Sequence, residues 1–383
     1  MISEPSPTRL WCERVATPVG ERRGLLLDVV DGRIADLQPA AGPPADAERV
    51  AGWTVPGFVD THVHGGGGHD YATLDVEEAR AARAFHRAHG TTTALASLVT
   101  AELDTLVAQI ETLAPLVRTG ELAGLHLEGP FLSPAKKGAH TASLLVPPTP
   151  EAVDRLLEVA DGTLAMVTIA PELPGALAAI ARFVEGGVAI AVGHTDGDET
   201  DARRALDAGA TVATHLFNAM RPIHHREPGP VPVLLGDERV MVELIGDGFH
   251  LHRDVVRMAV DAAGLDRVAL VTDAMVATGM PDGGYTLGGL EVVVRHGEAR
   301  LVEDDDSPGS IAGSTLTMAA GFAFLVSLGM SIPGAAHLAA STPARRHGLS
   351  DVGTIEVGAA ADLCVVDDAG RLQRVLQNGS WVG

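Results

Sequence analysis

The sequence is poor in cysteine, in lysine and in basic charge. Its 383 residues include two cysteines, Cys12 and Cys364, and two lysines, Lys136 and Lys137. Two cysteines do not make a disulfide framework. Acidic residues number 50 against 28 basic ones, and the formal net charge of −22 argues against nucleic acid or an anionic membrane surface as a partner.

Long hydrophobic runs are also missing. The most continuous one, residues 318–330, is about 13 residues long, well short of the ~20 that span a bilayer. Residues 1–15 lack the basic start and apolar core of a signal peptide, so we expect a cytoplasmic protein. The sequence is rich in apolar residues, at 46%, and in histidine, with 16. The apolar content predicts a large packed core, and the histidines require an explanation.

Short apolar runs alternate with segments of helical period from residue 57 onward. The runs that we interpret as strands are 58–61, 92–99, 122–127, 164–169, 188–192, 211–214, 240–245 and 268–272. The helical segments are 76–88, 103–117, 151–159, 176–184, 199–208 and 253–262. This alternation predicts an α/β fold, a (β/α)8 TIM-like barrel. An open doubly wound sheet is the alternative, although no G-x-G-x-x-G motif follows any of the runs.

The two ends of the chain have a different, β-rich pattern. Asp31-Gly32 between two apolar runs predicts a hairpin over residues 24–37. The C-terminal end contains three further short runs, 354–357, 363–367 and 375–382. We expect both ends to pair into a small β-sandwich domain of residues 1–55 and 352–383, attached to a barrel of residues 56–351.

Polar side chains follow most of the predicted barrel strands. Barrel enzymes carry their catalytic groups at the carboxyl ends of the strands, so these side chains should converge on one face. In chain order they are His62 and His64, Glu128, His194, His215, Asp247 with His250, and Asp273.

These residue types indicate a metal site. His62 and His64 are two residues apart on a strand, so both imidazoles point to the same side, although paired histidines are also ordinary surface or packing residues. Glu128 precedes Gly129-Pro130, and a metal is the simplest compensation for its buried charge. Asp273, at the end of the last strand, is placed to act as a general acid/base; a turn or capping role is the alternative for both carboxylates.

Several motifs occur together at these positions. They are PGFVDTHVHGGGG (56–68), HLEGPFLSPAKKGAH (126–140), VGHTD (192–196), THLFNAM (214–220), HHREPG (224–229), GDGFH (246–250), VTDA (271–274), GSIAGSTLTM (309–318) and GTIEVGAAADLCVVD (353–367). Over most of its length the chain resembles the N-acetylglucosamine-6-phosphate deacetylases of the amidohydrolase superfamily. The HxH pair alone would indicate only the superfamily.

The resemblance implies that the protein removes the acetyl group of N-acetylglucosamine 6-phosphate, giving glucosamine 6-phosphate and acetate, in amino-sugar catabolism. It implies one or two divalent metals per subunit: a principal one at Glu128, His194 and His215, and a second at His62 and His64. The expected bridge between them is Glu128, Asp273 or hydroxide, and Asp273 matches the catalytic acid/base. Zinc is the first choice, with iron, manganese or cobalt as alternatives. The positions matching sugar- and phosphate-binding residues are Ala139, His140, Asn218, Ala219, Arg226, His250, Ile311, Ala312 and Gly313.

The resemblance also implies a homodimer, in which the HHREPG loop could reach the phosphate bound by a neighbouring subunit. In a chain of charge −22 a phosphate needs a local cation, and Arg226, flanked by His224 and His225, offers a bidentate donor. Lys136 and Lys137 lie in a loop that could close over the substrate; surface charge is the alternative reading.

The scarcity of lysine separates the chain from other superfamily members. Relatives of the dihydroorotase and urease type bridge two metals with a carboxylated lysine on the fourth strand, and here that strand ends Ile169-Ala170-Pro171-Glu172. Two alternative functions stay open. One is a deacetylase for another N-acetylhexosamine phosphate, and the other is a non-catalytic sugar-phosphate sensor on the same barrel.

Overall fold

The computed structural model describes residues 8–303 and 308–383. The chain forms two compact units, one containing residues 8–60, 86–93 and 318–383 and the other containing residues 61–85 and 94–317. The first unit therefore includes residues 318–351 as well as the terminal strands. The domain boundaries expected from the sequence, 1–55 with 352–383 and 56–351, stay a prediction.

Eight parallel strands form the barrel sheet, in the order β14-β13-β12-β11-β10-β9-β8-β5. They are β5 (Phe58–Val63), β8 (Thr91–Val99), β9 (Gly124–Glu128), β10 (Leu164–Ile169), β11 (Ala189–Val192), β12 (Val212–Ala213), β13 (Met241–Ile245) and β14 (Val268–Val271). The backbone N–H of Asp273 donates to the carbonyl of His62 at 2.8 Å, and Val63 bridges to Ala274. These contacts join the two edge strands, so the sheet is nearly closed and the predicted fold class is confirmed.

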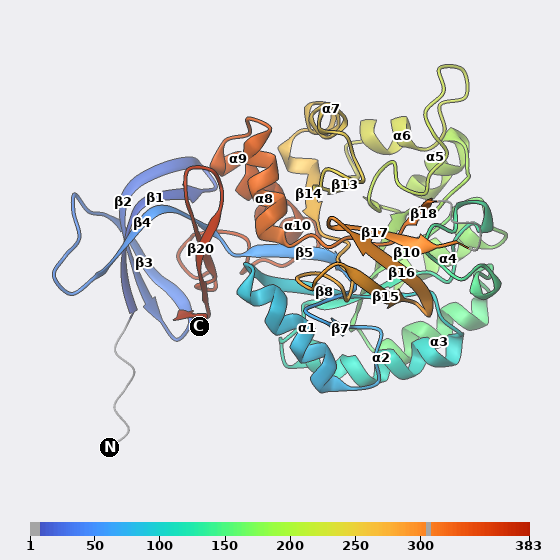
Figure 1. Ribbon diagram of the computed structural model, residues 1–383, viewed down its shortest axis with the longest axis horizontal. Helices are drawn as coiled ribbons and strands as arrows, with labels where there is room; N and C mark the ends of the chain where they lie inside the picture. The colour runs from blue at the N-terminus through green and yellow to red at the C-terminus, as the bar shows by residue number, and fades with distance from the viewer. Residues whose placement is uncertain (1–7, 304–307) are drawn as a thin grey trace. The chain divides into compact units, whose positions relative to one another are not determined.

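Helices alternate with these strands and lie on the outside of the sheet (Figure 1). They are α1 (Val76–Ala88), α2 (Leu103–Arg118), α3 (Pro150–Ala160), α4 (Ala176–Glu185), α5 (Glu199–Asp207), α6 (Val231–Gly236) and α7 (Arg253–Ala263). The six expected helices are confirmed with ends within one residue. A side chain caps the start of α3, α5 and α7. The Asp198 side chain, for example, accepts the N–H groups of Thr200 and Asp201 at the start of α5.

A four-stranded antiparallel sheet follows the last barrel strand, and the sequence did not predict it. Its strands are β15 (Gly283–Leu287), β16 (Leu290–Arg295), β17 (Glu298–Val302) and β18 (Pro308–Ile311). This sheet shares a buried cluster with the barrel: Leu287, Val292 and Leu301 pack with Val99, the last residue of β8, and with Met275, which follows β14. The sheet is thereby fixed at the carboxyl end of the barrel. Two further short strands, β6 (Gly65–Gly66) and β7 (His69–Asp70), pair with each other.

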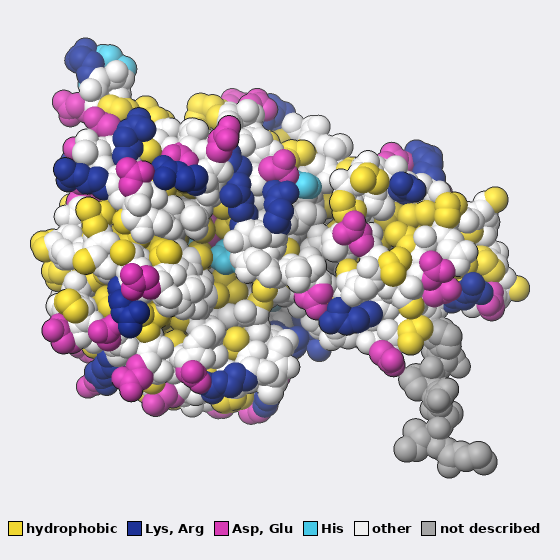
Figure 2. Space-filling model, turned by 180° about the vertical axis from the view of Figure 1, so that it is seen from behind, with side chains coloured by type: hydrophobic (Ala, Val, Ile, Leu, Met, Phe, Trp, Pro, Cys, Tyr) yellow, Lys and Arg dark blue, Asp and Glu magenta, His cyan; other side chains and the backbone are white. Residues whose placement is uncertain are grey.

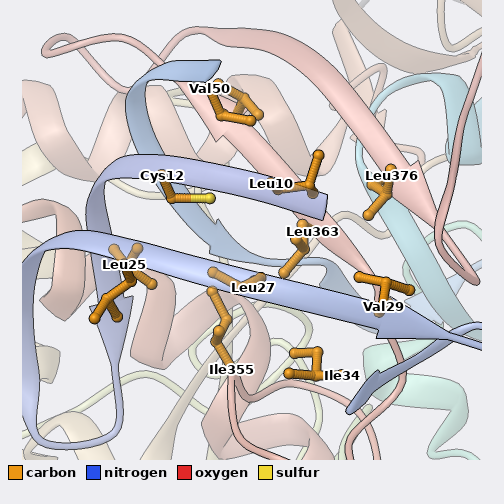
Figure 3. Close-up of a cluster of buried hydrophobic side chains, with 13 residues drawn as sticks. Leu10, Cys12, Leu25, Leu27, Val29, Ile34, Val50, Ile355, Leu363 and Leu376 are labelled. Carbon is orange, nitrogen blue, oxygen red and sulfur yellow. The ribbon is translucent and has the colours of Figure 1, made fainter. Parts of the chain in front are cut away.

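The two ends of the chain form one seven-stranded sheet, in the order β21-β20-β19-β4-β1-β2-β3. Its strands are β1 (Thr8–Thr17), β2 (Gly20–Val30), β3 (Arg33–Pro39), β4 (Glu48–Pro56), β19 (Leu363–Val366), β20 (Leu372–Gln377) and β21 (Ser380–Trp381). The expected hairpin is confirmed, since Asp31 (φ 50°) and Gly32 (φ 73°) form the turn between β2 and β3. Side chains from both ends pack into one core (Figure 3).

One expected terminal strand was wrong. Residues 354–357 form bends and turns, and Ile355 reaches the core of the terminal sheet from that loop (Figure 3). A single buried side chain in an irregular segment produces the same short apolar pattern as a strand. The unit also contains α8 (Met318–Ser327), α9 (Ile332–Ala336), a π-helical turn η4 (His337–Ser341) and α10 (Thr342–Arg346). Within the residues that the structure describes, no helix combines the length and apolar character of a membrane span.

Both cysteines are unpaired and buried in the unit that contains the terminal sheet. Cys12 lies in the hydrophobic core of that sheet, and Cys364 donates its thiol to the carbonyl of Gly90. Burial raises the pKa of the Cys12 thiol to about 11 and that of the Cys364 thiol to about 12. Because the thiolate is the reactive form, neither side chain has the properties of a reactive cysteine.

We therefore expect the folded protein to resist alkylation. Iodoacetamide at pH 8 should modify neither thiol in the native chain, and both in guanidinium chloride, as intact-protein mass spectrometry would show. Rapid single modification of the native chain would contradict the burial of these side chains.

Candidate metal centre and active site

Six predicted site residues converge at the carboxyl ends of the barrel strands. The potential ligand atoms form two groups, within each of which they lie less than 4.8 Å apart. The first group consists of His62, His64, Glu128 and Asp273, and the second of Glu128, His194 and His215. All six residues are buried. Six of the eight side chains that we expected on one face thus lie close together, and their roles as metal ligands stay a prediction.

Glu128 connects the two groups. Its Oε1 atom lies 2.9 Å from Nε2 of His215 and 3.1 Å from Nε2 of His194. Its Oε2 atom lies 3.1 Å from Nε2 of His64. The Oδ1 atom of Asp273 is also 3.1 Å from the same nitrogen. Oε1 thus lies nearest to the second group and Oε2 nearest to His64 of the first, although Oε1 is also 3.5 Å from Nε2 of His62.

The backbone is strained where several of these side chains leave their strands. His194 (φ 47°), His215 (φ 24°) and Asp273 (φ 50°) all have positive φ, although none is a glycine. Such conformations are uncommon for residues with a Cβ, and they persist where the surrounding structure holds them. Each is the second residue after the end of a barrel strand, and the turn aims the side chain into the barrel mouth.

The imidazoles are held from behind through Nδ1. Nδ1 of His64 lies 3.2 Å from the carbonyl oxygen of Ser97, and Nδ1 of His194 lies 2.9 Å from that of Lys136. A carbonyl oxygen only accepts, so each of these Nδ1 atoms carries the proton. Nε2 of both histidines is therefore the nitrogen that faces the centre, and in the neutral ring it carries the lone pair that binds metals.

The carboxylates attract positive charge into the centre. Burial alone would lower the pKa of His64, but its hydrogen bonds with Asp273 and Glu128 outweigh burial and raise the pKa to about 9. In His62 burial is likewise outweighed, here first by the charge of Glu128, and the pKa rises well above its usual value. Burial would raise the pKa of Asp273, but the charge of His62 and the hydrogen bond with His64 lower it to about 2.

This donor set suits a divalent metal. The Nε2 atoms of His62 and His64 are 3.2 Å apart, as are those of His194 and His215, and such nitrogen pairs need a shared cation or a proton between them. The carboxylates favour protonation of His62 and His64, and a bound cation would supply the same positive charge. Imidazole and carboxylate ligands suit zinc, iron, manganese or cobalt.

A cavity of about 370 Å³ opens beside the centre. Seven of the nine residues expected to bind substrate line it. They are Ala139, His140, Asn218, Ala219, His250, Ile311 and Gly313. Burial lowers the pKa of His140 to about 4, so this imidazole is neutral at neutral pH. Sequence reasoning missed the lining residues Leu287 and Ser310, because they belong to the small sheet that it did not predict.

Two of the expected substrate residues, Ala312 and Arg226, are not among the described residues that line the cavity. Ala312 is fully buried in the core of the small sheet. Arg226 is exposed and donates to Nε2 of His225 at 2.7 Å. The loop between β12 and α6 that carries it extends away from the barrel, and basic and histidine side chains gather at its tip (Figures 1 and 2).

His250 is oriented by a neighbouring carboxylate. Its Nδ1 atom lies 2.6 Å from Oδ2 of Asp247, and Oδ1 of Asp247 accepts the backbone N–H groups of Phe249 and His250. Because Nδ1 is engaged, Nε2 is the nitrogen that His250 can present to a ligand.

Glu243 is a further polar residue of the centre that sequence reasoning missed. It lies within the apolar run of β13, is fully buried and contacts Nδ1 of His62 at 3.2 Å. A carboxylate in the middle of a buried strand is a signal of a functional residue. It was missed because we looked for site residues at the ends of the strands.

The barrel and its buried His/Glu/Asp centre define a class, the barrel enzymes built around a divalent-metal site. Within that class the chain belongs to the amidohydrolase family, whose model matches residues 53–382.

Several relatives are similar over nearly the whole chain. An N-acetylgalactosamine-6-phosphate deacetylase of Escherichia coli O157:H7 is 36% identical, covering 97% of this chain and 98% of its own. An N-acetylglucosamine-6-phosphate deacetylase of Lysinibacillus sphaericus is 33% identical, covering 91% of each chain. The structure of a mutant N-acetyl-D-glucosamine-6-phosphate deacetylase from Mycobacterium smegmatis, in complex with N-acetyl-D-glucosamine-6-phosphate, is 45% identical with a TM-score of 0.94, covering 99% of this chain and 100% of its own.

Removal of divalent metal should destabilise the fold. A cation that binds the folded chain alone stabilises it by about 2.7 kcal/mol when the free ion is at 100 times its Kd. We expect chelation to lower the Tm by several degrees and added Zn²⁺, Mn²⁺ or Co²⁺ to restore it, as scanning calorimetry would show. Glu128→Gln, which weakens both groups, should lose most of this response. Equal Tm values for chelated and metal-loaded wild type would contradict the assignment of a metal centre.

Proposed function

We propose that this protein hydrolyses N-acetylglucosamine 6-phosphate to glucosamine 6-phosphate and acetate, as a metal-dependent deacetylase of amino-sugar catabolism. The observation that carries the proposal is the buried His/Glu/Asp centre, which opens into a cavity lined by seven of the expected substrate residues. The similarity to deacetylases over the whole chain supports it.

We assign two divalent ions to the centre, one at Glu128, His194 and His215 and the other at His62 and His64, and zinc is our first choice. Glu128 is the bridging candidate, because it belongs to both groups: Oε1 lies nearest to His215 and His194, and Oε2 lies nearest to His64. Ions bound there would supply Lewis-acid polarisation of the acetyl carbonyl and would ease the deprotonation of water.

The chain's own residues handle the proton. Asp273 lies beside His64 at the cavity wall and, as a carboxylate, takes the proton from the attacking water. As the amide bond breaks, the same proton passes from Asp273 to the leaving nitrogen, so that acetate and the amine are released. His140 and His250 line the cavity and hold the oxyanion and the sugar hydroxyls.

We also propose a homodimer in which Arg226 acts on the neighbouring subunit's substrate. Lys136 is the one lysine or arginine among the described residues that line the cavity, whereas Glu128 and Asp273 add negative charge there. A phosphate dianion needs further cationic donors, and Arg226 is exposed on a loop that extends away from its own barrel.

A second candidate substrate is N-acetylgalactosamine 6-phosphate. The relative from Escherichia coli O157:H7, which covers nearly the whole chain, carries the name of a deacetylase for that epimer. The chemistry at the amide is identical for both sugars, so the centre itself does not separate them.

Acetate release decides the proposal. We expect the metal-loaded protein to release one acetate per N-acetylglucosamine 6-phosphate, and Asp273→Asn to lower kcat by about 10²- to 10⁴-fold, because the general acid/base is lost. Comparison of kcat/KM for the two epimers assigns the substrate. Tight binding of both sugars without turnover in Zn²⁺, Fe²⁺, Mn²⁺ or Co²⁺ would instead support a sugar-phosphate sensor. Elemental analysis of the same sample should give two metal equivalents per chain.

Mixed dimers test the role of Arg226. Arg226→Ala should raise KM by roughly 10- to 100-fold, the loss expected when a charged hydrogen bond is removed. When Arg226→Ala is coexpressed with the inactive Asp273→Asn, mixed dimers should regain low-KM activity, because one site then combines an intact Asp273 with the partner's Arg226. Absence of this complementation in isolated mixed dimers would contradict action across the interface.

A further inference from the structure

Glu243 is a buried carboxylate inside the barrel for which the proposed reaction has no step. It lies in the middle of β13, where its neighbours Val242, Leu244 and Ile245 are all buried apolar side chains. Burial of an ionised carboxylate is costly, and an apolar residue would suit this strand better. Within the described residues no lysine or arginine pairs with Glu243, so its partners in the barrel must account for its presence.

Three hydrogen-bonding partners surround this carboxylate, and they come from two other parts of the barrel. Oε1 accepts from the hydroxyl of Thr61 at 3.1 Å. Oε2 lies 3.2 Å from Nδ1 of His62 and accepts the backbone N–H of His215 at 3.4 Å. Thr61 and His62 belong to β5, and His215 follows β12. Glu243 therefore contacts one residue from each group of the metal centre.

The two nitrogens of His62 face opposite neighbours. Nδ1 faces Glu243, whereas Nε2 lies 3.2 Å from Nε2 of His64 and 3.5 Å from Oε1 of Glu128. A carboxylate at Nδ1 holds the proton there and increases the electron-donating power of Nε2. His64 and His194 have neutral backbone carbonyls in the corresponding place. Among these three histidines, the charged acceptor is particular to His62.

We propose that Glu243 is a positioning residue for the metal centre: it holds the proton on Nδ1 of His62, so that Nε2 is presented to a divalent cation, and it anchors the backbone at His215. The inference rests on the metal dependence in the proposed function. Because Glu243 acts from behind two histidines, its removal should weaken metal binding without removing any ligand.

Co²⁺ binding to the full-length protein gives a readout that is independent of activity. Affinity is measured by competition with a chelator, followed by the visible absorption of bound Co²⁺. We expect Glu243→Ala to weaken binding about 100-fold and Glu243→Gln about 10-fold, within the range found when partners behind metal-ligating histidines are removed. The glutamine keeps an acceptor for Nδ1 but lacks the charge, so it should rescue part of the loss. The Co²⁺ spectrum should change in both variants.

Thr168→Val is the matched control. Thr168 is a fully buried residue of β10, and its hydroxyl bonds to His126 and Thr214, which are not predicted ligands. This variant should lower the Tm and keep Co²⁺ affinity within about threefold of wild type. An equal loss of affinity in Thr168→Val would show that any damage to the barrel interior weakens binding, and it would overturn the inference.

The remaining outcomes also test the role proposed for Glu243. Wild-type Co²⁺ affinity in both Glu243 variants would overturn the proposal, and if Glu243→Ala does not fold, wild-type affinity in Glu243→Gln would do so alone. A wild-type chain that binds no Co²⁺ would overturn it as well. If the wild type binds Co²⁺ but releases no acetate, the proposed function fails, and the affinities of the variants still settle the role of Glu243.

Discussion

The buried carboxylate of Glu128 is the constraint around which the barrel mouth is organised. Nε2 atoms of five histidines lie within 3.5 Å of its oxygens: His62, His64, His140, His194 and His215. An ionised carboxylate is tolerated at such depth when positive charge surrounds it. The histidines reach it from the ends of β5, β11 and β12 and from the loop after β9, so the requirement to neutralise one charge constrains how these strand ends are arranged.

This arrangement depends on an unusual backbone. His194, His215 and Asp273 adopt positive φ directly where their strands end, and Gly129, after Glu128, does the same at φ 99°. A Cβ at Gly129 would collide with the side chain of Thr100, which explains the glycine. The parallel sheet, with its buried apolar strands, supplies the rigidity that holds these conformations. A change that loosens the barrel strands should therefore also disturb the positions of His194, His215 and Asp273 in the centre.

The sequence predicted the elements whose signals are local. Barrel strands are buried on both sides and appear as apolar runs, and six of the eight polar residues named at their ends meet at the centre. Residues 283–311 were missed because their short strands pair only with one another, beyond the repeating pattern of the barrel. Glu243 was missed for the opposite reason: it lies inside a correctly predicted strand, and its role depends on two residues distant in the chain. Ala312 follows Ile311 in a matching motif, but its side chain turns into the core.

The electrostatics of the centre reconcile an acidic protein with an anionic substrate. The net charge of −22 acts over distances at which salt screens it, whereas a phosphate in the cavity responds to groups a few ångströms away. There, the negative charge of Glu128 and Asp273 is already balanced by the protons or cations that they attract onto the histidines. A neutral His140 adds no charge of its own. The phosphate must consequently find its cationic partners at the cavity wall, where Lys136 lies, and in the proposed dimer Arg226 of the neighbouring subunit would be a further one.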